Sequence, residues 1–258
     1  MQAAVVVTGA SSGLGAEFAR LAVAEGAKTV LIARNIVDLA RLATEIDPSG
    51  ERTVALGIDL AAPEAGETLV QELATRGLYC DTLINNAGFA LFGDAVKLDR
   101  ASQLGMIAVH IRAATDLMLR FLPGMIERKT GRILNVASVA GFVPGPQMAV
   151  YFASKAYLIS FSQSLMCESM GTGVSVTCLC PGPLRSPFLI RAGAQQMRLF
   201  ELFRTLPADE VARRGWEAMK AGRRLCVTGI GAKAAVVVTR FVPRGWVLAW
   251  VTRLQRGR

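Results

Sequence analysis

The chain has 258 residues, of which 52% are hydrophobic and 19% are charged, and this composition argues against intrinsic disorder. Lys and Arg outnumber Asp and Glu by 29 to 20, but residues 212–258 alone hold eleven basic residues and one acidic residue. The body of the protein is close to neutral, so nucleic-acid binding is not expected. Five cysteines and one histidine argue against a disulfide-stapled fold and a zinc site, and they favour a reducing, cytoplasmic compartment.

Short apolar runs rich in β-branched residues alternate along the chain with longer segments of helical periodicity. Glycines and prolines separate many of these segments, and Pro123 is expected to interrupt the long helix that contains it. The pattern predicts, in chain order, strand Ala3–Thr8, helix Gly13–Glu25, strand Lys28–Ala33, helix Ile36–Ile46, strand Thr53–Ile58, helix Pro63–Arg76, strand Thr82–Asn85, helix Ala101–Lys129, strand Arg132–Val136, helix Ala149–Ser169, strand Val174–Leu179 and strand Arg224–Thr228.

Apolar strands that alternate with helices are typical of an α/β fold in which a parallel sheet has helices on both faces. Right-handed crossovers give a doubly wound, Rossmann-like sheet of about seven strands, with its ligand crevice at the carboxyl ends of the strands. We expect one domain over residues 1–258, with a substrate lid around 183–206. No signal peptide is visible, and no apolar stretch is long enough to predict a membrane-spanning helix.

A glycine-rich loop, Thr8-Gly9-Ala10-Ser11-Ser12-Gly13-Leu14-Gly15, follows the first predicted strand directly. Glycines permit a tight turn and let the backbone approach a pyrophosphate, and the N-terminus of the next helix offers free N–H groups. The spacing differs from the general dinucleotide pattern G-x-G-x-x-G, so the glycines alone leave a plain strand–helix corner as an equal alternative. Their position after the first strand favours phosphate binding.

The end of the second predicted strand indicates which dinucleotide this loop would bind. An acid there would hydrogen-bond to the ribose of NAD, whereas an arginine can receive the 2′-phosphate of NADP. The chain has Arg34 at this place and no acid beside it, and Ser12 or Asn35 could add hydrogen bonds. We therefore expect NADP(H) as the cofactor. The alternative is that Arg34 is only a solvated loop cation.

Tyr151 and Lys155 lie one turn apart near the start of a predicted helix, so they share one face. A free tyrosine titrates near pH 10, and a nearby ammonium would lower that pKa. Alone, this pair also fits an ordinary amphipathic helix. Ser138 follows the fifth predicted strand, where a hydroxyl would face the crevice, although a serine there could equally cap a helix. Together with the glycine loop, the three side chains predict a catalytic site.

In these motifs the chain resembles the short-chain dehydrogenase/reductase family, in its short single-domain branch. The resemblance covers residues 3–190 and follows the order of the family's motifs. The loop residues Gly9, Ser11, Ser12, Gly13, Leu14 and Gly15 match the cofactor loop; Asp59-Leu60 matches the acid that contacts adenine; Asn85-Asn86-Ala87-Gly88 matches a motif beside the cofactor; Ser138, Tyr151 and Lys155 match the catalytic residues; and Pro181-Gly182 with Ser186 matches the segment beside the nicotinamide.

The resemblance implies the family's mechanism, partners and assembly. Tyr151 would exchange a proton with the substrate oxygen and Ser138 would hydrogen-bond the same oxygen. Lys155 would lower the pKa of Tyr151, and both side chains would contact the nicotinamide half of the cofactor. NADP(H) would exchange hydride with the carbon of a small-molecule carbonyl or secondary alcohol. The family also implies a homodimer or homotetramer.

One position departs from the family pattern. Val109-His110 stands where the family has Val-Asn, and that asparagine supports a water in the proton relay. His110 could keep the same geometry, or it could relay protons itself near neutral pH, so it joins the candidate catalytic residues. The alternative is a buried histidine held by a backbone carbonyl. We expect His110→Asn to leave catalysis largely intact.

Apolar residues flank the expected crevice and predict an apolar ketone or alcohol as the substrate, unless they only pack the core and the lid. Two other functions would use the same cofactor loop. An epimerase or dehydratase usually needs a sizeable C-terminal substrate domain, for which we expect no room, and a cofactor-sensing binding protein would not need the three catalytic residues. The apolar residues are Phe89, Leu91, Phe92, Phe142, Val143, Met148, Phe188, Leu189 and Ile190.

The C-terminal segment, residues 234–258, combines apolar and aromatic residues with five arginines. One interpretation is a helix that rests on a membrane surface, with Trp246 and Trp250 at the interface and arginines on anionic headgroups. The other is a terminal helix that packs on a neighbouring subunit or over the substrate cleft, with its arginines solvated.

Overall fold

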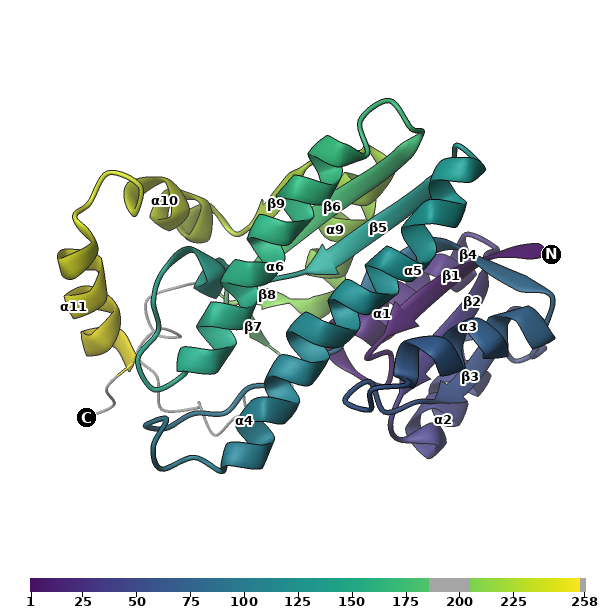
Figure 1. The fold of residues 1–258 in the computed structure, drawn as a ribbon, viewed down its shortest axis with the longest axis horizontal. Coiled ribbons are helices and arrows are strands. Elements are labelled where there is room, and N and C mark those ends of the chain that lie inside the picture. Colours follow the sequence, from purple (N-terminus) through teal and green to yellow (C-terminus); the bar gives the residue numbers. More distant parts are fainter. Residues whose placement is uncertain (186–204, 256–258) are drawn as a thin grey trace.

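The structure, a computed structural model that describes residues 1–185 and 205–255, is built on one parallel sheet. Its strands are β1 Gln2–Thr8, β2 Lys28–Ala33, β3 Thr53–Gly57, β4 Leu78–Asn85, β5 Gly131–Val136, β6 Val174–Pro181, β7 Leu184–Arg185, β8 Leu206–Pro207 and β9 Leu225–Thr228. Seven of them form the sheet, in the order β3-β2-β1-β4-β5-β6-β9 (Figure 1). The short strands β7 and β8 pair with each other beside it.

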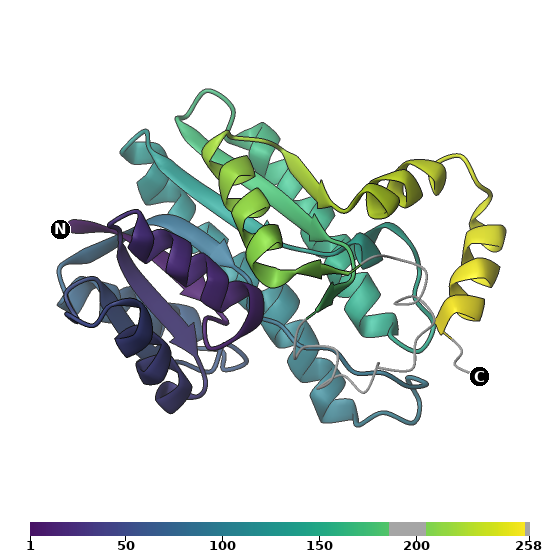
Figure 2. The same cartoon turned by 180° about the vertical axis from the view of Figure 1, so that it is seen from behind.

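Helices cover both faces of the sheet, as Figures 1 and 2 show. They are α1 Gly13–Ala24, α2 Ile36–Ile46, α3 Ala65–Thr75, α4 Arg100–Ile107, α5 Ala114–Glu127, α6 Ala149–Glu168, α9 Ala208–Lys220, α10 Ile230–Val238 and α11 Arg244–Gln255. Because successive strand residues point to opposite faces, Val6 of β1 packs in the core formed with α3, α5 and α6. Its neighbours Val5 and Val7 pack in the core formed with α1, α2 and α9.

The expected doubly wound α/β fold is confirmed, and each predicted strand is present. Strand β4 begins at Leu78, earlier than the predicted Thr82. Its register against β1 shifts between Ala4 and Val5, which skips Asp81. Such a bulge accommodates one extra residue, and this polar residue breaks the apolar run on which the prediction relied.

The long helix predicted over residues 101–129 consists of α4, a π-helical turn at Ala108–Ala113, and α5. The predicted interruption at Pro123 is wrong, because this residue lies inside α5. Its missing N–H would have bonded to the carbonyl of Leu119, which lies on the exposed side of the helix, where water can take that place. The interruption occurs instead at the π-helical turn, which contains His110.

The C-terminal part contains a helix that was not predicted, α9. It follows Pro207 and begins with Asp209 and Glu210, whose charges suit a helix N-terminus. The lid expected around 183–206 falls mostly on residues outside the described part of the chain, and its two ends form the β7–β8 pair. In residues 1–185 and 205–255, no helix has the length and apolar character that crossing a bilayer requires.

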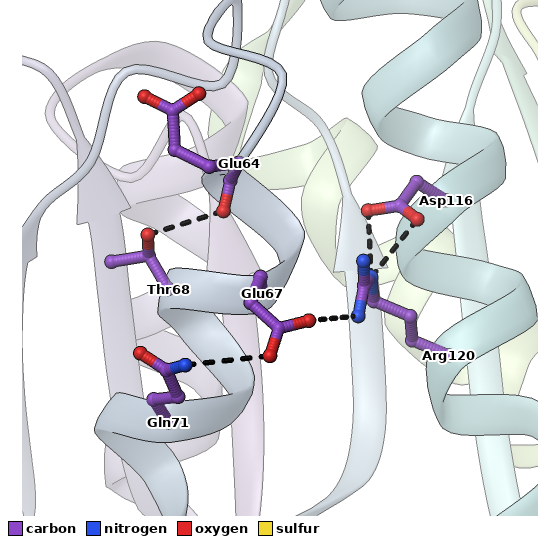
Figure 3. Close-up of polar contacts among 6 residues, drawn as sticks. All are labelled: Glu64, Glu67, Thr68, Gln71, Asp116 and Arg120. Atoms are coloured by element: carbon purple, nitrogen blue, oxygen red, sulfur yellow. Dashed lines mark hydrogen bonds and ion pairs between the residues drawn. The ribbon is translucent and has the colours of Figure 1, made fainter.

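Arg120 of α5 connects this helix to α3 at the surface of the molecule (Figure 3). Its guanidinium forms ion pairs of 2.9 Å with Asp116, one turn earlier, and with Glu67 of α3. Gln71 donates to the same Glu67 carboxylate at 3.3 Å. The helices lie so close that a Cβ on Gly66 would collide with Asp116. Exposed ion pairs contribute about 1 kcal/mol at most, so these bonds add only a little to the packing of α3 against α5.

Candidate active site

A cavity of about 940 Å³ opens at the carboxyl ends of the strands. It extends from the loop after β1 to the first turns of α6, and α10 and α11 form part of its wall. The cofactor and catalytic residues predicted from the sequence line this cavity, with three exceptions. Gly15 and His110 lie behind the lining, and Ser186 is outside the described residues.

The glycine loop is shaped by close contacts with the segment after β4. Gly9 has φ +66, and a Cβ there would lie 2.8 Å from the backbone of Ala87. A Cβ on Gly15 would strike the carbonyl of Gly9. The amide of Asn86 donates to the carbonyls of Thr8, at 2.9 Å, and Gly9, at 3.2 Å. Side chains at these glycines would therefore separate the two segments that form the floor of the cavity.

The N-terminus of α1 fits a pyrophosphate. Gly13 has φ +58, and no atom lies within 4 Å of the place where its Cβ would stand, so the backbone is open to a ligand. Ser12 is the N-cap residue, yet its side chain accepts no hydrogen bond from the helix. The first amides of α1 therefore have no capping side chain. A dinucleotide phosphate would supply the acceptor that these N–H groups need.

The end of the cavity beside β2 combines an unpaired cation with a carboxylate. Arg34 is exposed and forms no ion pair with any described residue. Asn35 caps α2 by accepting from the amides of Val37 and Asp38. The Asp38 carboxylate lines the cavity, accepts from the Asn35 amide at 2.8 Å and forms an ion pair with Arg41. Sequence reasoning missed Asp38 because this side chain reaches the cavity from the first turn of α2.

Asp59 and Leu60, the residues expected beside adenine, follow β3 and lie on the cavity wall. One carboxylate oxygen of Asp59 accepts from the amide of Ala61 at 2.9 Å, which fixes the turn. Leu60 is buried in the core. The side chains of Asp59 and Leu60 would thus offer one polar and one apolar surface to the planar ring of an adenine.

Ser138, Tyr151 and Lys155 meet on the floor of the cavity. Ser138 follows β5 and caps the next 3₁₀ turn, since its hydroxyl accepts from the Ala140 amide at 3.1 Å. The Ser138 hydroxyl lies close enough to the Tyr151 hydroxyl to lower the pKa of the tyrosine. Lys155 lies one turn further along α6, is buried, and donates to the carbonyl of Val136 at 2.8 Å. The ammonium nitrogen is 5.8 Å from the centre of the Tyr151 ring.

Burial shifts the pKa values of the tyrosine and the lysine in opposite directions. It raises the pKa of Tyr151 to about 12, although the hydrogen bond from Ser138 partly opposes this shift. It lowers the pKa of Lys155 to about 8. The expectation that Lys155 sets a low pKa for Tyr151 therefore does not hold for the chain by itself. Desolvation of the phenolate is the largest cause of the Tyr151 shift, and the Lys155 ammonium donates to the Val136 carbonyl.

His110 is buried beside Tyr151, and both of its ring nitrogens have protein partners. Nε2 accepts from the backbone N–H of Phe89 at 3.0 Å. A neutral imidazole then carries its proton on Nδ1, which donates to the Ser154 hydroxyl at 2.8 Å. Ser154 in turn donates to the carbonyl of Tyr151 at 2.7 Å. The ring also makes edge contacts with Phe89 and Tyr151, whose centroids lie 6.0 Å and 5.9 Å away.

These contacts fix the charge of His110 as well as its place. Burial, together with the Lys155 ammonium, holds the pKa of His110 well below its usual range. Protonation of Nε2 would also set two donors, the ring and the Phe89 amide, against each other. The histidine is held by a backbone amide, where the sequence suggested a carbonyl. It leaves no space at Gly88, because a Cβ there would lie 2.7 Å from Nε2.

The two C-terminal helices complete the cavity wall, which the sequence did not predict in detail. Val247 and Val251 of α11 form a buried cluster with Met148 and Phe152. Gln255, at the end of α11, lines the cavity and is 1% exposed, yet neither its oxygen nor its nitrogen has a hydrogen-bond partner. Of the apolar residues expected at the crevice, Phe89, Phe142, Val143 and Met148 line the cavity, Leu91 and Phe92 do not, and Phe188, Leu189 and Ile190 lie outside the described residues.

Comparison with known proteins identifies the family. The family model of the short chain dehydrogenases matches residues 3–196. The chain belongs to the short-chain dehydrogenase family. It is 36% identical over 214 residues to sulfoacetaldehyde reductase 2 of Chromohalobacter salexigens, a match that covers 81% of this chain and 84% of the relative.

Two further similarities bear on the activity of this short-chain dehydrogenase. It is 35% identical over 178 residues to ketoacyl reductase HetN of Nostoc sp., which covers 69% of this chain and 62% of the relative. The chain thus spans less than two thirds of the length of HetN. A short-chain dehydrogenase from Sphingobium yanoikuyae, solved in complex with NADPH, superposes with a TM-score of 0.80 at 29% identity, covering 93% of this chain and 94% of the other.

Proposed function

We propose that this short-chain dehydrogenase transfers hydride between NADP(H) and an apolar carbonyl compound or secondary alcohol. The observation that carries the proposal is the meeting of Ser138, Tyr151 and the buried Lys155 in one cavity, which continues to the glycine loop. The names of both curated relatives denote reductases. The buried, protonated Tyr151 holds the proton that reduction of a carbonyl requires.

The proposed mechanism assigns the proton to Tyr151. With a pKa of about 12, its hydroxyl is protonated at neutral pH and can donate to the oxygen of a bound carbonyl. Ser138 donates to the same oxygen and stabilises the charge that develops there. The Lys155 ammonium then stabilises the tyrosinate, because it is held within the same buried site. A reduced nicotinamide, when bound, supplies the hydride that the carbonyl carbon receives.

We assign His110 a positioning role. Its bonds connect the backbone at Phe89, beside the cofactor loop, to Ser154 and the backbone of Tyr151. Both ring nitrogens are engaged, so the imidazole has no free lone pair with which to accept a proton from the cavity. His110 therefore orients the tyrosine and does not transfer protons.

The proposed cofactor is NADP(H), and Arg34 is the residue that would receive its 2′-phosphate. Its guanidinium has no ion-pair partner in the described structure, whereas the neighbouring Asp38 is engaged by Arg41 and Asn35. We expect Arg34→Ser to weaken NADPH binding by about tenfold or more and to change NADH binding little. Arg52→Ser, at an exposed arginine before β3, is the matched control. Equal loss of both cofactors would remove Arg34 from this role.

The activity itself is tested by consumption of NADPH with a panel of ketones that range from small and polar to long and apolar. The proposal expects turnover that increases with the apolar area of the substrate, because Phe142, Val143 and Leu254 line the cavity. Cofactor binding without turnover of any substrate would favour a sensor. Product formation without net consumption of NADPH would favour an epimerase or dehydratase.

We also propose that the chain assembles as a homodimer or homotetramer. Four large apolar side chains lie exposed along α4 and α5, and a contact between copies would cover them. They are Leu104, Ile107, Leu119 and Ile126. A molar mass by light scattering that falls to that of one chain in Leu119→Asp would support this interface, and an unchanged mass would reject it.

A further inference from the structure

The helices α10 and α11 pack on the rest of the protein with one side only. Both views show them standing out from the body, at the end of the molecule opposite β3 (Figures 1 and 2). Their inner sides are buried: Ala232 and Val236 of α10 face the cavity, and Val251 and Leu254 of α11 do the same. The wall of the cavity is therefore only one helix thick here, and the opposite sides of both helices face outward.

The outward sides are apolar and aromatic, and we call them the C-terminal patch. Ile230 and Val237 lie two turns apart on one side of α10, and Trp246 and Trp250 lie one turn apart on one side of α11. The loop between the helices carries Phe241, which is 83% exposed. The C-terminal patch comprises Ile230, Val237, Val238, Phe241, Trp246 and Trp250, all between 45% and 88% exposed.

The charge around the C-terminal patch indicates what covers it. Lys233, Arg240, Arg244 and Arg253 are exposed, and none forms an ion pair with the described residues. Residues 230–255 contain no acidic residue. If two copies met through this patch, their positive charges would face each other, which opposes a symmetric contact. The nearly neutral body offers no acidic surplus to a second copy either. An anionic surface complements these charges.

We propose that the C-terminal patch binds the surface of an anionic lipid bilayer. Tryptophan and phenylalanine side chains favour the boundary between headgroups and acyl chains, and arginines beside them pair with lipid phosphates. Trp250 lies at the border of the patch and the cavity, because it lines the cavity and is 45% exposed. The cavity thus opens beside the bilayer, where an apolar substrate would concentrate. The binding step does not depend on the proposed activity.

Vesicle co-sedimentation of the full chain tests this proposal. Vesicles of phosphatidylcholine alone are compared with vesicles that contain about one third phosphatidylglycerol, at low and high salt. We expect binding to the anionic vesicles to exceed binding to the neutral ones by at least tenfold, and to weaken with salt. Phe241→Ser/Trp246→Ser and Arg240→Glu/Arg244→Glu should each lower it by at least tenfold. These four side chains do not line the cavity.

Matched controls and fluorescence make the outcome decisive. Met170→Ser and Arg52→Glu change exposed residues outside α10 and α11 and should bind as the unaltered chain does. Trp216 is buried, so a blue shift of tryptophan emission on vesicle binding would come from Trp246 and Trp250. Equal binding by the patch variants and the controls would overturn the proposal. A self-association without vesicles that Phe241→Ser/Trp246→Ser abolishes would also overturn it, in favour of a contact between copies.

Discussion

The effect of His110 on stability can be measured without interference from another imidazole, because it is the only histidine in the chain. In the folded protein its pKa lies well below 6.5, since burial and the Lys155 ammonium disfavour the imidazolium. In the unfolded chain it takes up a proton near its ordinary pKa. The contribution of His110 to the free energy of unfolding is therefore fully present well above pH 6.5 and is lost as the pH falls below that value. We predict that His110→Asn removes this acid-side loss.

The size of the effect follows from proton linkage. If the folded protein binds no proton at His110, the loss of stability is about 0.4 kcal/mol at pH 6.5 and about 1.4 kcal/mol at pH 5.5, relative to pH 8. Carboxylates with lowered pKa, such as Asp47 at about 2, lose their contribution at more acidic pH. Lys155, with a pKa of about 8, titrates at the upper end of this window, but it is present in both proteins and its contribution cancels in their difference. The difference between the two proteins thus isolates the histidine.

Urea unfolding at pH 5.5, 6.5 and 7.5, followed by circular dichroism, measures the effect. Two variants are compared with the unaltered chain. His110→Asn places an amide near the position of Nδ1 and can keep the bond to Ser154. His110→Gln places an oxygen near the position of Nε2 and can keep the bond from Phe89. Both variants should show the flatter pH dependence and should retain most of the activity. Parallel stability curves for all three proteins would refute the argument, as would an imidazole that titrates near pH 6.5 in the NMR spectrum of the folded chain.

Two further predictions concern the residues around this histidine. Tyr151→Phe should lower the rate of carbonyl reduction by about a thousandfold or more, and Ser138→Ala should lower it by about a hundredfold, because each removes a group that acts on the substrate oxygen. Cofactor binding should stay nearly unchanged in both. Single-turnover kinetics with a cofactor titration would show whether binding was lost instead. Gly88→Ala should cost about 1–3 kcal/mol by forcing its methyl group against Nε2 of His110, and most of that cost should vanish in the His110→Asn background, as a double-mutant cycle in urea would measure.

The sheet and the floor of the site were predictable because their signals are local. The apolar strand runs, the glycine loop and the Tyr151–Lys155 spacing each lie within a short stretch of the sequence. Local patterns do not predict the bulge at Asp81 in β4, because the bulge depends on how this strand pairs with β1. Helix α9 had local signals, Asp209 and Glu210 at its start and a buried face with Val211, and sequence reasoning did not use them.

The π-helical turn and the cavity wall depend on contacts between distant segments. No local pattern marks Ala108–Ala113 as a π-helix; the turn contains His110, which contacts Phe89 and Ser154 from two other segments. The wall that α10 and α11 add depends on tertiary packing of Val247 and Val251 against Met148. The direction of the pKa shift of Tyr151 could not be predicted without the fold either, because burial raises this pKa, whereas the neighbouring lysine suggested a lower one.

The opposite shifts of Tyr151 and Lys155 explain how one buried pair can favour a direction of reaction. At pH 7, a tyrosine with a pKa of about 12 is harder to ionise than a free one, so the phenol is its resting form. Reduction begins from the phenol, whereas oxidation of an alcohol begins from the phenolate. The ammonium cannot remove this difference alone, because desolvation weakens its own charged form. A positive charge brought by an oxidised nicotinamide would stabilise the phenolate and favour the lysine's neutral form, so the cofactor's redox state sets which proton transfer is favourable.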